Sequence, residues 1–251
     1  MRMTKRLLIG AALLALVIGG LWVWQRSWGG LRPLSAPSAD ERASLLQWLE
    51  SDTTADAPAP DRGAYQREFF GEAWQDVDHN SCDTRNDILG RDVSDADYSR
   101  LPGVQGRLLG FDQGVFACPN ATVFAGTLAD PYSGQSVDFV RGAQTSEAVQ
   151  IDHIVPLFYF YAHGGWRLVG SPEQDRLVEF ANDPLNLLAV SGAANQDKLA
   201  KGPSEWVPAN EAYRCEYASR WVAVYEKYQP LGLTLDPRDR EYLLGELAAC
   251  N

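Results

Sequence analysis

Two adjacent residues near the middle of the chain, Asp152 and His153, have the types needed for metal-assisted hydrolysis. A neutral imidazole, with an ordinary pKa near 6.5, can take a proton from water. A carboxylate oxygen and an amide oxygen, such as that of Asn195, are suitable ligands for a hard divalent cation. Phosphodiester cleavage needs both, because water must become nucleophilic and charge develops on the phosphate and the departing 3′ oxygen. The pair alone is weak evidence, but together with Asn186, Asn195 and Lys198 it indicates a phosphodiester hydrolase.

The elements that must position these residues can be read from the surrounding pattern. Residues 148–152 mix apolar and polar residues with β-branched side chains, which predicts a short strand that Pro156 prevents from running on. The apolar run 186–190 predicts a second strand. Ser191-Gly192 then reads as a turn and N-cap for a helix over 193–200, which stops before a Gly-Pro pair.

These elements would bring the chemical groups together. Neighbouring side chains of an extended strand point apart, so Asp152 and His153 are expected to lie on either side of a scissile bond. Asn195 falls in the first turn of the predicted helix and is expected to face the two strands.

The combination of Asp-His-Ile-Val-Pro with Asn186, Asn195 and Lys198 resembles the HNH, or His-Me finger, endonucleases. The wider frame, over roughly residues 64 to 250, resembles the HNH module at the C-terminus of GmrSD-type restriction enzymes and of exported bacterial nuclease-like proteins. The motifs that carry this wider resemblance are Tyr65-x-Arg67, Phe70-Gly71-x-Ala73-Trp74, Cys82-Asp83-Thr84-Arg85-Asn86-Asp87, Asp130-Pro131-Tyr132-Ser133-Gly134 and Lys201-Gly202-Pro203-x-Glu205-Trp206.

The resemblance implies a role for each matching residue. His153 would be the general base, Asp152 and Asn195 would bind the metal, and Asn186 would brace the loop that carries His153. Asn195 stands where the motif's second histidine is usual, a common variant that keeps an oxygen ligand. The implied cofactor is a divalent metal, first of all Mg²⁺, with Mn²⁺ or Zn²⁺ as alternatives.

Three cationic residues have two readings each. Arg85 could grip a phosphate oxygen with its two guanidinium nitrogens, or form a local salt bridge with Asp83 or Asp87. Lys198 and Lys201 could touch the backbone of a nucleic acid, or belong to a solvated helix face. For Lys201 the solvated face is the favoured reading.

The N-terminus predicts export. Residues 7–24 form an unbroken apolar or glycine run, preceded by basic residues, and the first thirty residues contain no acidic side chain. Tryptophans cluster at the far end of the run, as at a membrane interface, and no clear Ala-x-Ala cleavage site follows. An uncleaved anchor is favoured over a removed signal peptide, and either places the rest outside the cytoplasm, on the cell surface or secreted.

The four cysteines agree with an exported chain, because disulfides persist in oxidising compartments. None belongs to a Cys-x-x-Cys metal pair, and three pairings are open. We expect Cys82 to pair with Cys118 and Cys215 with Cys250. The second bridge would fix a terminus that otherwise frays.

The charge argues against tight duplex binding. The whole chain has a formal net charge of −11, and removing the four basic residues among the first thirty leaves about −15. Duplex-binding proteins usually have a basic surface, because phosphate contacts dominate their affinity. The expected partner is therefore DNA, with RNA as an alternative, bound weakly and with low sequence specificity. No protein partner is inferred.

The chain divides into a membrane segment over 1–30, a linker over 31–61 and one domain over 62–251. The linker contains an amphipathic helix with a Ser38/Glu41 capping box, which could dock on the domain or form a stalk. The domain is expected to be α+β, with the metal-binding strand pair and helix (ββα-metal) at its centre. Further predicted elements are a hairpin over 122–128 and 136–140, a helix from Ser171 toward Phe180, and a last helix after Asp236.

The leading hypothesis is thus an exported, metal-dependent endonuclease. Two others stay open at this point. One is a catalytically silent surface or binding module on the same scaffold. The other is a hydrolase of a different phosphodiester, such as a teichoic-acid-like or nucleotide substrate.

Overall fold

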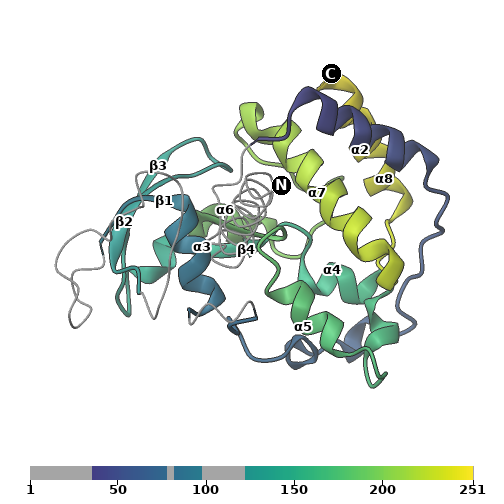
Figure 1. The fold of residues 1–251 in the computed structure, drawn as a ribbon, viewed down its shortest axis with the longest axis horizontal. Coiled ribbons are helices and arrows are strands. Elements are labelled where there is room, and N and C mark those ends of the chain that lie inside the picture. Colours follow the sequence, from purple (N-terminus) through teal and green to yellow (C-terminus); the bar gives the residue numbers. More distant parts are fainter. Residues whose placement is uncertain (1–35, 78–81, 98–121, 251) are drawn as a thin grey trace, which may run out of the picture.

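The computed structural model describes residues 36–77, 82–97 and 122–250. They form a single mixed α and β domain, with a small sheet at one side, a helical lobe at the other and a two-stranded pair between them (Figure 1). The α+β class expected from the sequence is therefore confirmed. The predicted membrane segment lies outside the described residues. Within them, no helix is long and apolar enough to cross a membrane.

The small sheet has the antiparallel order β1-β2-β3, with β1 at Val93–Asp97, β2 at Ala125–Ala129 and β3 at Ser136–Val140. The predicted hairpin corresponds to β2 and β3, which pair from Ala125↔Val140 to Ala129↔Ser136. Helix α3, Thr84–Asp92, begins at an Asp83 N-cap and leads directly into β1. Leu128 and Phe139 bury the inner face of the sheet in a small apolar cluster of its own.

The central pair consists of β4, Val149–His153, and β5, Leu187–Ser191, which run antiparallel. Its two faces belong to different cores. Leu187 and Ala189 pack into the cluster beneath the small sheet, whereas Leu188 and Val190 pack into the large cluster of the helical lobe. This explains why residues 187–190 read as a continuous apolar run, since a strand covered on both faces needs apolar side chains at every position.

The helical lobe is built around α7, Arg214–Tyr228, and α8, Pro237–Ala249. Trp221 and Tyr225 of α7 are fully buried in its core. Asp236 caps α8, with Pro237 at the first helical position, as the sequence predicted. The lobe also contains α4, Leu157–Ala162, and α5, Asp175–Ala181. The prediction for α5 was wrong at its start, because residues 171–174 form turns before the helix begins at Asp175.

Helix α2, Ala39–Ser51, shows the predicted capping box between Ser38 and Glu41. It packs on α7 and α8 (Figure 1), with Leu49 completely buried and the Trp48 ring 5.4 Å from that of Tyr225. Of the two alternatives for this helix, docking is the one observed.

The segment after α2 is also held to the domain. Asp52 accepts a hydrogen bond from the Tyr225 hydroxyl at 2.7 Å and pairs with Arg240 at 2.9 Å. The amide of Ala59 donates to the Ala162 carbonyl at 2.7 Å. Residues 39–61, expected to be a linker, are thus part of the packed structure.

The remaining elements are short and connect those above. They are the 3-10 turns η1 Arg62–Ala64, η2 Arg67–Phe70, η4 Ser146–Ala148, η5 Gly165–Leu168, η6 Glu211–Tyr213 and η7 Gln229–Leu231, and the helix α6 Gly192–Lys198 that follows β5.

Candidate active site

The site lies where β4 ends and α6 crosses it. Ser191, the last residue of β5, caps α6 by accepting a hydrogen bond from the amide of Ala194 at 3.3 Å, as the sequence predicted. Gly192 lets the helix pack against the 3-10 turn η4 that leads into β4, because a Cβ at this position would lie 2.0 Å from the carbonyl oxygen of Glu147. The cap and the close packing therefore fix the position of α6 relative to β4.

His153 is half-buried and held from two sides. Its Nε2 lies 2.9 Å from the carbonyl oxygen of Ala181. Since a carbonyl can only accept, Nε2 must carry the proton, which leaves Nδ1 of the neutral ring as an acceptor. The ring also stacks on Trp74, with 6.2 Å between centroids and 14° between planes. Burial, with a smaller contribution from the positive charge of Arg67, lowers the pKa of His153 to about 4.

Asp152 points to the opposite face of β4 and is 5% exposed. Its carboxylate accepts a hydrogen bond from the Tyr132 hydroxyl at 2.6 Å. The Lys198 ammonium lies 3.0 Å from each of its oxygens and also donates to the His153 carbonyl at 2.8 Å. Burial raises the pKa of Asp152 and lowers that of Lys198, while their mutual attraction opposes both shifts. The structure thus places Lys198 beneath the site.

Asn195 lies on α6, near the middle of the helix, and faces β4. Its Nδ2 donates to the Gln150 side chain at 2.9 Å, and within the part of the chain that the structure describes its Oδ1 has no hydrogen bond. Asp152, His153 and Asn195 all line one cavity of about 350 Å³. The three residues singled out for base and metal chemistry therefore meet at a single opening.

Asn186 is fully buried just before β5 and holds the loop after His153. Its Oδ1 accepts from the Val155 amide at 2.8 Å, its Nδ2 donates to the Val155 carbonyl at 3.1 Å, and its own carbonyl accepts from the Ile154 amide at 2.8 Å. These contacts are the bracing geometry expected of Asn186.

The donor set at the cavity suits a divalent cation. A carboxylate has about four acceptor positions, and those of Asp152 are taken up by the Tyr132 hydroxyl, by Lys198 at both oxygens and by the His153 backbone, so a cation would have to displace one of these contacts. Mg²⁺ commonly takes one or two protein oxygens and completes its shell with water and phosphate. Another cluster of metal-type ligands, Cys215, Glu246 and Cys250, does not fit, because its two sulfurs form a disulfide.

The other two cationic candidates lie elsewhere. The Arg85 guanidinium sits 5.9 Å from the centre of the Phe139 ring, under the small sheet, where burial and the nearby Arg141 lower its pKa. Lys201 donates to the Asp197 carbonyl at 2.6 Å on a partly solvated turn after α6. Neither Arg85 nor Lys201 is among the residues that line the cavity.

Three residues of the site were not assigned a role from the sequence. Tyr132 bonds Asp152, Trp74 stacks on His153, and the charge of Arg67 acts on the His153 ring. All three stand in motifs that carry the family resemblance. Pattern alone did not single them out, because their contacts with Asp152 and His153 exist only in the folded chain.

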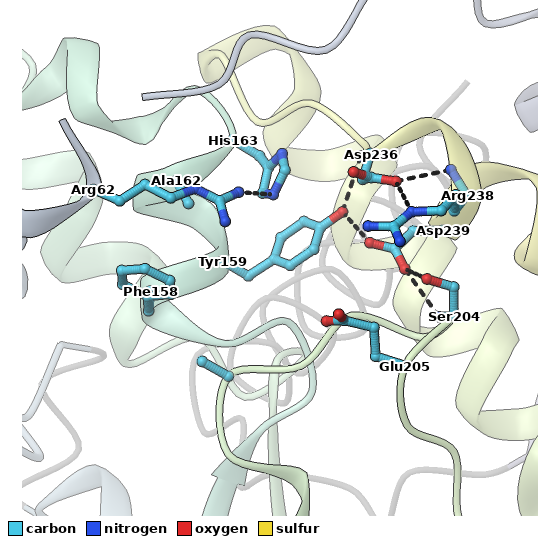
Figure 2. Close-up of a pocket in the computed structure, with 11 residues that line it drawn as sticks. Arg62, Phe158, Tyr159, Ala162, His163, Ser204, Glu205, Asp236, Arg238 and Asp239 are labelled. Carbon is cyan, nitrogen blue, oxygen red and sulfur yellow. Dashed lines mark hydrogen bonds and ion pairs between the residues drawn. The ribbon is translucent and has the colours of Figure 1, made fainter. Parts of the chain in front are cut away.

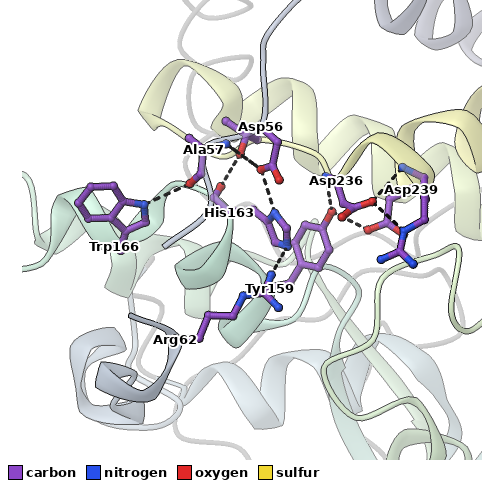
Figure 3. A network of polar contacts seen from close by, with 10 residues as sticks. Asp56, Ala57, Arg62, Tyr159, His163, Trp166, Asp236 and Asp239 are labelled. Carbon is purple, nitrogen blue, oxygen red and sulfur yellow. Dashed lines mark hydrogen bonds and ion pairs between the residues drawn. The ribbon is translucent and has the colours of Figure 1, made fainter. Parts of the chain in front are cut away.

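A second, more polar cavity of about 110 Å³ adjoins the first, and Phe158 and Ala200 line both (Figure 2). In Figure 3, His163 lies between Asp56 and Arg62, with Nδ1 2.9 Å from the carboxylate and Nε2 3.0 Å from the guanidinium. His163 also stacks on Tyr159, with 4.3 Å between ring centroids. This network fastens the segment after α2 to α4, so His163 has a structural explanation.

The disulfide prediction is confirmed for one pair: Cys215 on α7 is bonded to Cys250 at the end of α8. Cys82 is also disulfide-bonded. Cys118, its expected partner, lies outside the described residues.

Comparison with known proteins confirms the resemblance. Residues 114–234 match the family described as GmrSD restriction endonucleases, C-terminal domain. The match includes β4, β5 and α6 with every residue assigned to the base or the metal. A protein of Arthroderma benhamiae, described as an uncharacterized secreted protein, is 28% identical over 220 residues, which cover 87% of this chain and 91% of the relative. No solved structure matches the chain. The family match points to a nuclease-type function.

Proposed function

We propose that the protein is an exported, divalent-metal-dependent endonuclease with low sequence specificity. The observation that carries the proposal is the meeting of Asp152, His153 and Asn195 at one cavity, inside the stretch that matches the GmrSD family. Export is supported by the disulfide, by the apolar N-terminal run, and by a relative that is described as secreted.

Each residue of the site has a distinct role in the proposed hydrolysis. Nδ1 of His153 accepts the proton of the attacking water, because Nε2 is committed to the Ala181 carbonyl. Asn186 fixes the loop behind the ring, and Trp74 fixes its plane. Asp152 and Asn195 would hold the cation, which when bound supplies positive charge to the phosphate and the leaving oxygen.

Lys198 and Tyr132 keep Asp152 in place. A buried carboxylate without partners would be costly, so the ammonium and the hydroxyl stabilise its charged form before any cation arrives. They also fix the direction of the carboxylate. We therefore assign Lys198 a positioning role, in place of a contact with the nucleic-acid backbone.

Nicking of a supercoiled plasmid by the full-length protein tests the proposal. Wild type is expected to cleave with Mg²⁺ or Mn²⁺ and to be inactive with a chelator. The cleavage rate of His153→Ala is expected to be at least about 100-fold lower, which is the usual contribution of a general base. His163→Gln is the matched control, since that histidine is structural and its variant should retain cleavage. Unchanged cleavage by His153→Ala would remove His153 from the mechanism.

The acidic charge favours one further candidate, a hydrolase of a small phosphodiester. Such a substrate needs no basic surface, because it presents a single phosphate. Cleavage of bis(p-nitrophenyl) phosphate without cleavage of plasmid or oligonucleotide would select this function.

A further inference from the structure

Leu199, the residue that ends α6, combines two unfavourable features at the mouth of the cavity. Its side chain is 68% exposed, more than that of any other large hydrophobic residue in the described ranges. Its backbone has φ +51° and ψ −126°, a region distinct from the left-handed helical one, in which a side chain is strained and which mainly glycine adopts. Both features cost free energy.

Strain of this type concentrates around the site. Besides Leu199, the described non-glycine residues with positive φ are Asp95, at an irregularity of β1, and Trp74. The conformation of Trp74 brings its ring onto His153. Leu199 has no such packing contact to explain its conformation. An exposed apolar side chain, held by a strained backbone at a reaction site, indicates a contact made with a ligand.

The walls beside Leu199 are apolar and aromatic. Tyr65, Pro156, Leu157 and Phe158 line the same cavity, and the rings of Tyr65 and Phe158 meet edge to face at 5.2 Å. None of the described residues that line the cavity is lysine or arginine. Ionic contacts with the phosphate backbone give most duplex-binding proteins their affinity, and these lining residues offer no basic side chain to make them.

We propose that Leu199 and Phe158 bind an unpaired nucleobase beside the scissile phosphate, which makes single-stranded nucleic acid the preferred substrate. This inference rests on the proposed function. Bases are paired and stacked inside a duplex, but in a single strand their faces are free to pack on aromatic and apolar side chains. A net acidic protein with an apolar cavity rim gains affinity from such contacts and little from the backbone.

Binding of a short fluorescein-labelled oligonucleotide, measured by anisotropy with a chelator present, tests the inference. Wild type is expected to bind the single strand at least about fivefold more tightly than the same sequence in a duplex. Leu199→Gly, whose glycine readily adopts this backbone conformation, is expected to lose this preference. Its thermal midpoint should equal or exceed that of wild type, so the loss cannot be attributed to unfolding. Val140→Thr, at another exposed apolar position on β3, is the matched control and should bind like wild type.

Equal affinity of wild type for both forms, or unchanged single-strand binding by Leu199→Gly, would overturn the inference. Binding and cleavage data together also distinguish failure of this inference from failure of the proposed function. Selective single-strand binding without any cleavage would keep the base contact and reject the nuclease, whereas cleavage of plasmid duplex and single strands at equal rates would keep the nuclease and reject the base contact.

Discussion

At the scale of residues, the site depends on two neighbouring side chains that the strand sends to opposite faces. The face toward the small sheet gives His153 an aromatic neighbour and a carbonyl partner, so the imidazole stays neutral and its free nitrogen is defined. The other face gives Asp152 a hydroxyl and an ammonium, which stabilise a buried charge. The two side chains of one dipeptide thus meet different environments, as the proposed roles of base and acidic ligand require.

The lowered pKa of His153 predicts the acid limit of the reaction. The catalytic form is the neutral ring, and its pKa falls from 6.5 to about 4, so the active form persists down to lower pH than usual. The initial rate of oligonucleotide cleavage at saturating Mg²⁺ should stay near its plateau at about pH 5, where an ordinary histidine is more than about nine-tenths protonated. A rate profile that halves near pH 6.5 would contradict this expectation.

At the scale of elements, the close approach of α6 to β4 decides where Asn195 stands. Gly192 allows α6 to pack closely on η4, the turn that leads into β4, whereas Gly245 on α8 has no atom within 4 Å of where a Cβ would be. Replacement of glycine by alanine can therefore be compared at a crowded position, Gly192, and at an open one, Gly245.

Gly192→Ala is expected to lower the free energy of unfolding by about 1–3 kcal/mol, because the new methyl group forces the helix away from η4. It should also reduce plasmid cleavage, since Asn195 moves with the helix. Gly245→Ala should instead raise the unfolding free energy by about 1 kcal/mol, through better helix propensity, and leave cleavage unchanged. Urea unfolding and nicking rates of both variants provide the comparison. A stable, fully active Gly192→Ala protein would refute the assigned role of Gly192.

Most of the elements around the site could be predicted from local signals. The cap at Ser191, the capping box at Ser38 and the proline after Asp236 act within one helical turn, and each was found where it was expected. The start of α5 was wrong because Pro172 is equally acceptable in a turn, and the following residues continue that turn.

At the scale of the whole molecule, two cores meet at the central strand pair. The cluster beneath the small sheet and the larger helical cluster each cover one face of β5, so this strand is enclosed by both halves of the domain. The helical half includes α2 and the segment up to residue 61. The folded unit that supports the site is therefore larger than the sequence indicated.

Leu49→Ala tests the part played by α2. Since Leu49 is fully buried against the helical core, its truncation should lower the free energy of unfolding by about 2–5 kcal/mol. Gln47→Ala, on the exposed side of the same helix, should change it by less than about 0.5 kcal/mol. Urea denaturation of the full-length proteins measures both. Equal stability of the two variants would mean that α2 is a detached stalk.

The sequence by itself determined which chemical groups the candidate site contains, namely an imidazole, a carboxylate and an amide, carried by two strands and a helix. Those features are encoded in short spacings and helix caps, which depend only on neighbours along the chain. Only the tertiary structure decided that Lys198 lies beneath Asp152, that Trp74 and Tyr132 join the site, and that an exposed leucine stands at its mouth. Burial and contacts between distant segments set these features, and local spacing carries no information about either.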